Sequence, residues 1–309
     1  MRLVFAGTPD AAVPSLRLLA VSDHEILAAV TRRDAPVGRK RVITPSPVAA
    51  AAEELGIDTI RTDRLDAAAT AQITALEPDL GVIVAYGGLV REPLLSTPVH
   101  GWINLHFSLL PRWRGAAPVQ HALIAGDRLT GAAVFQLVAA LDAGDVFAQQ
   151  EYRVPYGATA GEVLAALSTE GARLLHEVID SIAAGTARTH AQVGEPTLAP
   201  KLGDDDGRIR WDESRDAVLA RIHGVTPEPG AHTTVDGARV KVLAARAASA
   251  GAPGLPPGEL ASHGRDVIAG TATEPVTLER VQPAGKGAMS AADWWRGRRD
   301  TGAATRAGS

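Results

Sequence analysis

The sequence predicts an α/β protein with a Rossmann-like, mostly parallel sheet that carries helices on both faces, followed by a smaller β-rich domain. In the first part of the chain, apolar runs typical of buried strands alternate with helical segments. Strands that alternate with helices form parallel sheets covered on both faces. From about residue 201, short alternating stretches lie between Gly- and Pro-rich turns, a pattern that favours a small β domain. The length of 309 residues corresponds to about two domains at roughly 150 residues each.

The first domain opens as a strand, a turn and a helix. Arg2 to Ala6 is an apolar run, Gly7-Thr8-Pro9 is a tight turn, and Asp10 to Val21 is a helix that tolerates Pro14 in its first turn. The last expected helix of this domain, 159–184, is long and contains a glycine interruption. The other expected elements are strands at 25–30, 57–60, 80–86, 102–106, 132–138 and 146–154, and helices ending at residue 55 and spanning 66–76, 118–125 and 159–184.

The domain boundary is expected within 193–206, where Gly-Glu-Pro, Ala-Pro and Gly-Asp-Asp-Asp-Gly interrupt the periodicity. This places the first domain at 1–192, a linker at 193–206 and the second domain at 207–309. Strand-like stretches in the second domain are expected at 232–235, 240–243, 266–269 and 276–281.

Composition excludes several classes of protein. The chain is 46% hydrophobic and 21% charged, which is a globular balance, and its net charge of −4 carries no overall basic character for binding nucleic acid. It has no cysteine, which excludes disulfides, thiolate metal sites and cysteine nucleophiles. Neither a membrane-spanning apolar run nor a secretory signal is recognisable, so we expect a cytoplasmic protein with no membrane partner. We also expect a monomer.

Common catalytic and cofactor motifs are missing. The first turn supplies one glycine where the dinucleotide-binding fingerprint needs three, so we expect no NAD. The sequence also contains no Walker loop, no H-E-x-x-H helix and no G-x-S-x-G elbow.

The segment 101–118 carries the most informative polar pair. Asn104 and His106 are two residues apart in an apolar strand, so their side chains share a face near its carboxyl end, where open α/β sheets bind ligands. An amide N–H can stabilise an oxyanion, and an imidazole can accept a proton from an attacking amine, which suits acyl transfer to an amine. The spacing alone favours a structural interpretation, in which Asn104 closes the strand end and His106 is a hydrogen-bonded core histidine.

Longer motifs show a resemblance. The run N-L-H-F-S-L-L-P-R-W-R-G-A-A-P is similar to the signature of the folate-dependent formyltransferases. Further matching stretches follow in order: A-G-T-P at 6–9, T-P-S-P-V at 44–48, A-Y-G at 85–87, A-G-D-x-x-T-G at 125–131, L-D-A-G-D at 141–145, A-P-K-L at 199–202, P-E-P-G-A at 227–231 and Q-P-A-G-K-G-A-M-S-A-A-D-W-W-R-G at 282–297.

The resemblance implies transfer of a formyl group from 10-formyltetrahydrofolate, without a metal, to the α-amino group of methionine esterified to initiator tRNA. The family's catalytic residues correspond to Asn104, which would hold the formyl oxygen, and to His106 and Asp142, which would handle proton transfer. Which of the two takes the first proton stays open. The folate-contacting stretch corresponds to Ser108, Leu109, Leu110 and Pro111.

The resemblance also implies a tRNA substrate and an OB-like β-barrel as the second domain. The loop 32–41, with five positive charges against one, corresponds to the loop that enters the acceptor stem and contains Arg39, Lys40 and Arg41. In the second domain, Lys286, Arg296 and Arg298 lie near Trp294 and Trp295, a mixture that suits an RNA backbone. Without the resemblance, the first segment fits a solvated surface loop, and the second fits tryptophans that anchor packing beside arginines in a solvated tail.

Two other functions stay open from the sequence. A nucleotide-sugar formyltransferase would share the catalytic trio, and a folate- or RNA-binding protein without turnover would share the fold. The sequence departs from the family pattern at Lys40, where glycine is usual, and at Ala143, where threonine is usual.

Overall fold

The computed structural model describes residues 1–38, 41–298 and 305–308, which form two compact units. The first unit contains residues 1–118, 129–153 and 164–200, and the second contains 119–128, 154–163 and 201–309. Two short segments that precede residue 193, 119–128 and 154–163, therefore group with the second unit. The continuous ranges expected from the sequence stay a prediction.

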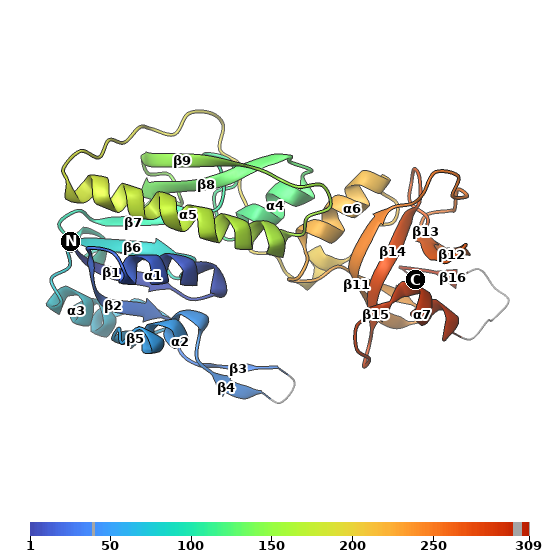
Figure 1. Ribbon diagram of the computed structural model, residues 1–309, viewed down its shortest axis with the longest axis horizontal. Coiled ribbons are helices and arrows are strands. Elements are labelled where there is room, and N and C mark those ends of the chain that lie inside the picture. Colours follow the sequence, from blue (N-terminus) through green and yellow to red (C-terminus); the bar gives the residue numbers. More distant parts are fainter. Residues whose placement is uncertain (39–40, 299–304, 309) are drawn as a thin grey trace. The chain divides into compact units, whose positions relative to one another are not determined.

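The first unit is built on a seven-stranded sheet with the order β5-β2-β1-β6-β7-β8-β9 (Figure 1). The strands are parallel from β5 to β7, and β8 and β9 add antiparallel pairs at one edge. The predicted Rossmann-like, mostly parallel sheet is therefore confirmed. The strands are β1 Arg2–Gly7, β2 Glu25–Thr31, β5 Thr59–Arg61, β6 Leu80–Val84, β7 Trp102–His106, β8 Leu129–Gln136 and β9 Val146–Arg153.

Helix α5, Ala160–Ala183, packs closely on this sheet. A Cβ atom added at Gly171 would lie 3.1 Å from both Cδ atoms of Leu105, so the missing side chain lets the helix approach β7. The helix runs unbroken through this glycine, which corrects the expected interruption. The other helical elements of this unit are η1 Asp10–Ala12, α1 Val13–Ala20, α2 Pro47–Glu54, α3 Ala67–Ala75 and η2 Leu94–Ser96.

Part of the segment 32–41 is paired as β-structure with the residues that follow it, although the sequence indicated only a polar loop. Strand β3, Ala35–Val37, pairs with β4, Val42–Thr44, and the hairpin extends away from the main sheet in Figure 1. At its base, Nη1 of Arg61 donates to both carboxylate oxygens of Asp34, at 2.8 and 2.9 Å. Three-residue strands carry too little periodicity to be predicted from the sequence.

The second unit contains an antiparallel sheet with the order β10-β11-β14-β13-β12-β16. A bridge between Val235 of β10 and Ala307, which follows β16, links the first and last strands, so the sheet closes into the predicted small barrel. Trp211 and Trp294 are buried in its core. The strands are β10 His232–Val235, β11 Ala238–Ala247, β12 Glu259–His263, β13 Asp266–Ala269, β14 Val276–Pro283, β15 Met289–Ser290 and β16 Thr305–Arg306.

Three helices accompany this barrel, and the sequence predicted only the first of them. They are α4 Pro118–Ile124, α6 Arg215–Gly224 and α7 Ala291–Arg296; η3, Asp204–Gly207, is a further short turn. Across the described part of the chain, no helix combines the length and apolar character needed to cross a bilayer.

Candidate active site

Strand β7 presents Asn104 and His106 on the face of the sheet opposite to Leu105, and therefore opposite to α5. The Asn104 side chain is partly exposed, and the described residues supply no hydrogen bond to its carboxamide. Asn104 is also the only asparagine in the chain. A half-buried amide without an internal partner is free to donate to a bound molecule.

The imidazole of His106 is buried and has a defined orientation. Its Nε2 lies 2.8 Å from the carbonyl oxygen of Trp113, and the edge of the ring meets Phe135 with 6.3 Å between ring centroids. Because a carbonyl oxygen can only accept, Nε2 carries the hydrogen, and in the neutral ring Nδ1 keeps its lone pair. The face shared with Asn104 therefore holds a base with a free nitrogen.

Asp142 lies beside that nitrogen, in the loop between β8 and β9. Its Oδ2 is 3.9 Å from Nδ1 of His106, and the same oxygen accepts a hydrogen bond from the Gly115 N–H at 2.7 Å. The Asp142 side chain is 12% exposed, so its charge is poorly screened by water. The carboxylate is thus placed to stabilise His106 when the ring becomes protonated.

Burial lowers the pKa of His106 below its ordinary value, because the charged ring would lose its hydration. The Asp142 carboxylate and the Trp113 carbonyl oppose this shift. The ring is therefore neutral at physiological pH and able to accept a proton at Nδ1, where the Asp142 carboxylate can stabilise the resulting positive charge.

The sequence analysis missed Gln192, which holds the Asp142 loop in place. Its Nε2 donates to the carbonyl oxygens of Asp142, at 2.8 Å, and Gly144, at 2.9 Å. Its Oε1 accepts from Nη2 and Nε of Arg114, at 2.7 and 3.1 Å. Asp142 has a φ of +43°, in the left-handed region that non-glycine residues rarely adopt, so external hydrogen bonds help to maintain this conformation.

Thr197 positions Trp113, whose carbonyl oxygen accepts the hydrogen bond from His106. Its Oγ1 accepts a hydrogen bond from the Trp113 N–H at 2.9 Å, and its backbone oxygen accepts from the Arg114 N–H at 2.8 Å. At Gly115, φ is +127° and an added Cβ would lie 2.6 Å from the Ala199 carbonyl oxygen. No side chain therefore fits at the residue whose N–H binds Asp142.

The stretch Ser108 to Pro111, predicted to contact folate, directly follows β7. The hydroxyl of Ser108 donates to the Arg112 carbonyl at 2.6 Å, and Leu110 is buried in a cluster that includes Phe135. These side chains support the turn from within. Contact with folate stays a prediction.

The predicted tRNA contacts have different surroundings. Arg39 and Lys40 lie outside the described residues, and Arg41 is exposed immediately before β4. Lys286 is also exposed. Arg296 pairs with Asp293 on α7.

Arg298 is only 14% exposed. It binds Asp236 at 2.5 Å, and its guanidinium lies 4.8 Å from the ring centroid of Trp295. Among the Lys and Arg side chains that were predicted to contact tRNA and that the structure describes, Arg298 therefore has the most contacts within the protein. Its role in tRNA binding stays a prediction.

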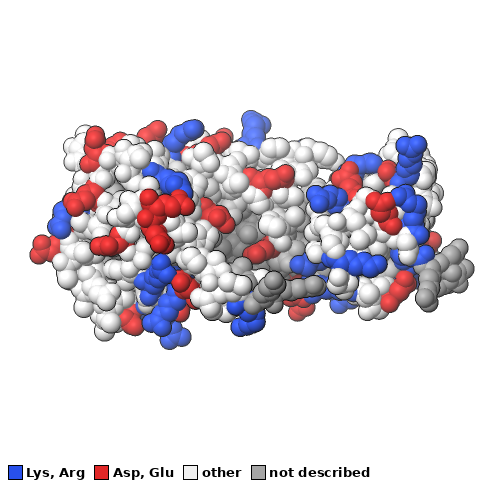
Figure 2. Space-filling view, turned by 60° about the horizontal axis from the view of Figure 1, so that its bottom comes forward, with Lys and Arg blue, Asp and Glu red and all other residues white. Residues whose placement is uncertain are grey.

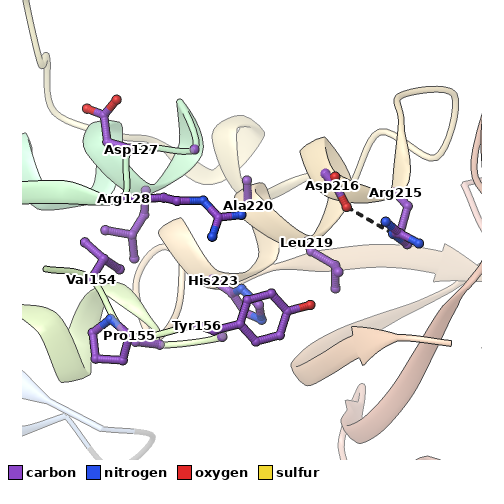
Figure 3. A pocket seen from close by; sticks show the side chains of 14 residues that line it. Asp127, Arg128, Val154, Pro155, Tyr156, Arg215, Asp216, Leu219, Ala220 and His223 are labelled. Atoms are coloured by element: carbon purple, nitrogen blue, oxygen red, sulfur yellow. Dashed lines mark hydrogen bonds and ion pairs between the residues drawn. The ribbon is translucent and has the colours of Figure 1, made fainter. Parts of the chain in front are cut away.

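A cavity of about 450 Å³ lies in the second unit (Figure 3). Arg128, Tyr156 and His223 line it, together with Arg215, which pairs with Asp216 at 3.0 Å. The Tyr156 side chain is exposed, so its ring is available for stacking. Basic and acidic side chains are interspersed over the face shown in Figure 2. A polyanion would therefore bind at local groups of basic side chains, such as those that line this cavity.

Sequence comparison assigns the class of protein. Residues 1–179 match the family model described as "Formyl transferase", and residues 201–299 match "Formyl transferase, C-terminal domain". The chain therefore belongs to the formyl transferase family.

Within that family it groups with proteins named methionyl-tRNA formyltransferase. It is 63% identical to the one from Clavibacter sepedonicus over 96% of this chain and 97% of that protein. It is 59% identical to the one from Leifsonia xyli subsp. xyli, with the same coverage of both chains.

Solved structures share the fold. WlaRD, a sugar 3N-formyl transferase crystallised with dTDP and 5-N-formyl-THF, has a TM-score of 0.69 at 12% identity and covers 93% of this chain and 99% of its own. HypX from Aquifex aeolicus in complex with tetrahydrofolic acid has a TM-score of 0.65 at 16% identity, covering 95% of this chain and 46% of its own.

Proposed function

We propose that this protein transfers the formyl group of 10-formyltetrahydrofolate to the α-amino group of methionine esterified to initiator tRNA, and that Asn104, His106 and Asp142 carry out the chemistry. The observation that carries the assignment is the free Nδ1 of His106, 3.9 Å from the Asp142 carboxylate, on the face shared with Asn104. The family membership and the names of the relatives support the substrate assignment.

In the proposed reaction, the neutral amine attacks the formyl carbon and the carbonyl oxygen becomes an oxyanion. The Asn104 carboxamide donates a hydrogen bond to that oxyanion, a preorganised interaction that strengthens as the charge develops. Nδ1 of His106 accepts the proton that the attacking nitrogen loses. The imidazolium then lies beside Asp142, so one buried charge is formed next to its opposite.

Collapse of the tetrahedral intermediate breaks the bond between the formyl carbon and N10 of the folate. The leaving nitrogen takes up a proton, which the imidazolium can return, and tetrahydrofolate is released. The His106 and Asp142 pair thus handles the proton in both directions, as in other acyl transfers that use an oriented base. Its return to the neutral state completes the cycle.

The tRNA part of the proposal rests on charge and aromatic groups outside the catalytic trio. The β3–β4 hairpin exposes Val42 and Ile43 next to Arg41, which combines an apolar edge with a cation. The cavity in the second unit places Arg128 with Tyr156, a pairing suited to a phosphate and a stacked base. We expect the protein to act as a monomer in the cytoplasm.

A substrate comparison tests the proposal. The purified protein is given 10-formyltetrahydrofolate with Met-tRNA or with a nucleotide-linked amino sugar, and formylated product and released tetrahydrofolate are measured. We expect turnover with Met-tRNA. Turnover with the sugar alone would indicate a sugar formyltransferase, and folate binding without turnover would indicate a binding protein.

A variant tests the role of the amide in the same assay. Asn104→Ala is expected to lower kcat by about a hundred- to a thousandfold, because it removes one oxyanion donor. Gln150→Ala removes an exposed amide from β9 and serves as the matched control. Near-normal kcat in folded Asn104→Ala would contradict the catalytic assignment.

A further inference from the structure

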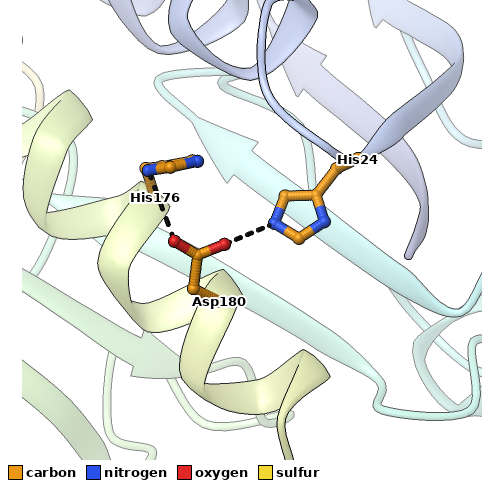
Figure 4. Close-up of side chains that lie close together, drawn as sticks. All are labelled: His24, His176 and Asp180. Carbon is orange, nitrogen blue, oxygen red and sulfur yellow. Dashed lines mark hydrogen bonds and ion pairs between the residues drawn. The ribbon is translucent and has the colours of Figure 1, made fainter.

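A second group of ionisable side chains lies in the first unit, away from the catalytic trio. His24 precedes β2, and His176 and Asp180 are one turn apart on α5. Figure 4 shows the Asp180 carboxylate between the two imidazoles, with one oxygen directed to each. Oδ1 is 3.0 Å from Nε2 of His24, and Oδ2 is 3.6 Å from Nδ1 of His176.

This cluster is separate from the candidate active site. Strands β1, β2, β6 and β7 are parallel, so the start of β2 and the end of β7 lie at opposite ends of the sheet. His24 stands at the first of these ends, whereas Asn104 and His106 stand near the second. The proposed formyl transfer therefore does not use the cluster.

We propose that His24, His176 and Asp180 form a binding site for a divalent transition-metal ion, with Zn²⁺ the best match. Two imidazole nitrogens and one carboxylate oxygen are a donor set that Zn²⁺ accepts, with the fourth position open to water. Ligand atoms from the three residues all lie within 4.8 Å of one another. Residues four apart on a helix share a face, so His176 and Asp180 present their donors together.

The geometry requires only a small adjustment to hold an ion. Bonds of about 2.0 to 2.1 Å in a tetrahedron put ligand atoms roughly 3.4 Å apart. The separations of 3.0 and 3.6 Å run to different oxygens of Asp180, and with one donor atom from each residue the three atoms lie within 4.8 Å of one another, so they have to approach by up to roughly 1.4 Å. The His176 side chain is 29% exposed and can rotate about its side-chain torsions to close the remaining gap, whereas His24 is only 5% exposed and provides the fixed ligand.

The surroundings of His24 fix the ring with Nε2 toward the Asp180 carboxylate, at 3.0 Å. The Met1 amino group lies 3.3 Å from Nδ1 and as an ammonium can only donate there, so Nε2 carries the ring hydrogen in the absence of an ion. An ion bound at Nε2 replaces that hydrogen, and the Met1 amino group then has to give up its contact with Nδ1. Asp180 is 54% exposed, which gives an ion access from solvent.

An ion at this position would join α5 to the start of β2, two segments far apart in sequence. An ion that binds the folded state raises its stability by mass action. The expected role is therefore structural, and we expect the melting temperature of the protein to rise with Zn²⁺ concentration.

The test uses the full-length protein without an affinity tag, stripped with EDTA and then freed of chelator. Calorimetric titration with Zn²⁺ is expected to give one ion per chain. Co²⁺ is expected to give the visible absorption bands of a tetrahedral nitrogen and oxygen site. His176→Ala and Asp180→Asn are each expected to weaken Zn²⁺ binding at least tenfold and to abolish the rise in melting temperature.

His190→Ala is the matched control, because this exposed histidine lies outside the cluster. Circular dichroism verifies that each variant is folded before titration. Absence of saturable Zn²⁺ binding, or equal binding by the wild type and both ligand variants, would overturn the proposal and leave His24 and Asp180 as a hydrogen-bonded contact. Formylation assays in EDTA are expected to be unaffected, so the metal site and the proposed function are tested independently.

Discussion

Replacement of Gln192 by alanine tests whether the Asp142 loop needs an external support. The change removes two hydrogen bonds that Nε2 donates to the loop, to Asp142 and Gly144, and two that Oε1 accepts from Arg114. Gln192 touches neither His106 nor Asn104 in these contacts. Any effect on the chemical step must therefore act through the position of the Asp142 carboxylate.

The expected magnitude follows from those contacts. The two bonds to carbonyl oxygens contribute about 1 kcal/mol each, and the bonds from the guanidinium contribute about 1.5 to 3 kcal/mol in total. Gln192 is partly exposed, so water replaces part of this sum. A remaining loss of about 1.5 to 3 kcal/mol at the transition state corresponds to a decrease in kcat of about 10- to 150-fold, because each 1.36 kcal/mol is tenfold in rate.

The assay is formylation of Met-tRNA at saturating concentrations of both substrates, with KM for the folate measured separately. Gln192→Ala is expected to lower kcat and leave the folate KM within about twofold, because none of the four hydrogen bonds of Gln192 reaches the predicted folate turn. Gln192→Glu keeps the pairing with Arg114 but loses both donors to the loop, so it is expected to stay impaired. Gln150→Ala is the matched control.

A folded Gln192→Ala variant with kcat within twofold of the wild type would refute the reasoning, because the loop would then keep its conformation without these bonds. Full activity in Gln192→Glu would show that Arg114, and not the two carbonyl oxygens, is the contact that matters. Urea unfolding of each variant separates loss of position from loss of the fold.

Three other predictions follow from named contacts. The neutral ring of His106 is the active base, and burial lowers its pKa, so the acid limb of the kcat profile is expected below pH 6.5. Asp142→Asn removes a charge that opposes this shift and is expected to move the limb to still lower pH. An acid limb above pH 7 in the wild type would contradict the assignment. Gly171→Val is expected to lower stability in urea by about 1 to 3 kcal/mol through overpacking against the sheet, and equal stability would argue against that contact. Arg41→Ala, but not the control Arg17→Ala, is expected to raise KM for Met-tRNA and reduce its salt dependence; identical behaviour would exclude Arg41 from the RNA contact.

Several elements could be predicted from the sequence because buried and exposed residues alternate regularly along a single strand or helix. Strand β7 was predicted with the observed bounds, as were the strands that became β10 and β13. The strand expected at 80–86 ends instead at Val84, because the chain turns at Ala85, with a φ of +48°. Its apolar pattern continues to Tyr86 since that side chain is buried in the core beyond the strand, where its hydroxyl donates to the Thr62 carbonyl.

The catalytic pair was accessible from spacing, because residues two apart on a strand share a face. Asp142 depended on the family resemblance, since a single aspartate in a Gly- and Asp-rich loop resembles an ordinary turn residue. Gln192 was missed because its segment has no periodicity and its contact with the Asp142 carbonyl joins residues 50 apart in sequence. The single asparagine in the composition was a signal that could have drawn attention to Asn104 earlier.

The sequence by itself determined the longer strands and helices of the first unit and which face of β7 carries polar groups, because the alternation of apolar and polar residues records burial along the local chain. Only the tertiary structure decided that Nε2 of His106 donates to Trp113, that Nδ1 is left facing Asp142, and that Gln192 holds the loop. These features depend on long-range contacts, in which loops from separate parts of the chain come within hydrogen-bond distance. Such contacts are determined by the packing of the whole unit and cannot be predicted from a local sequence pattern.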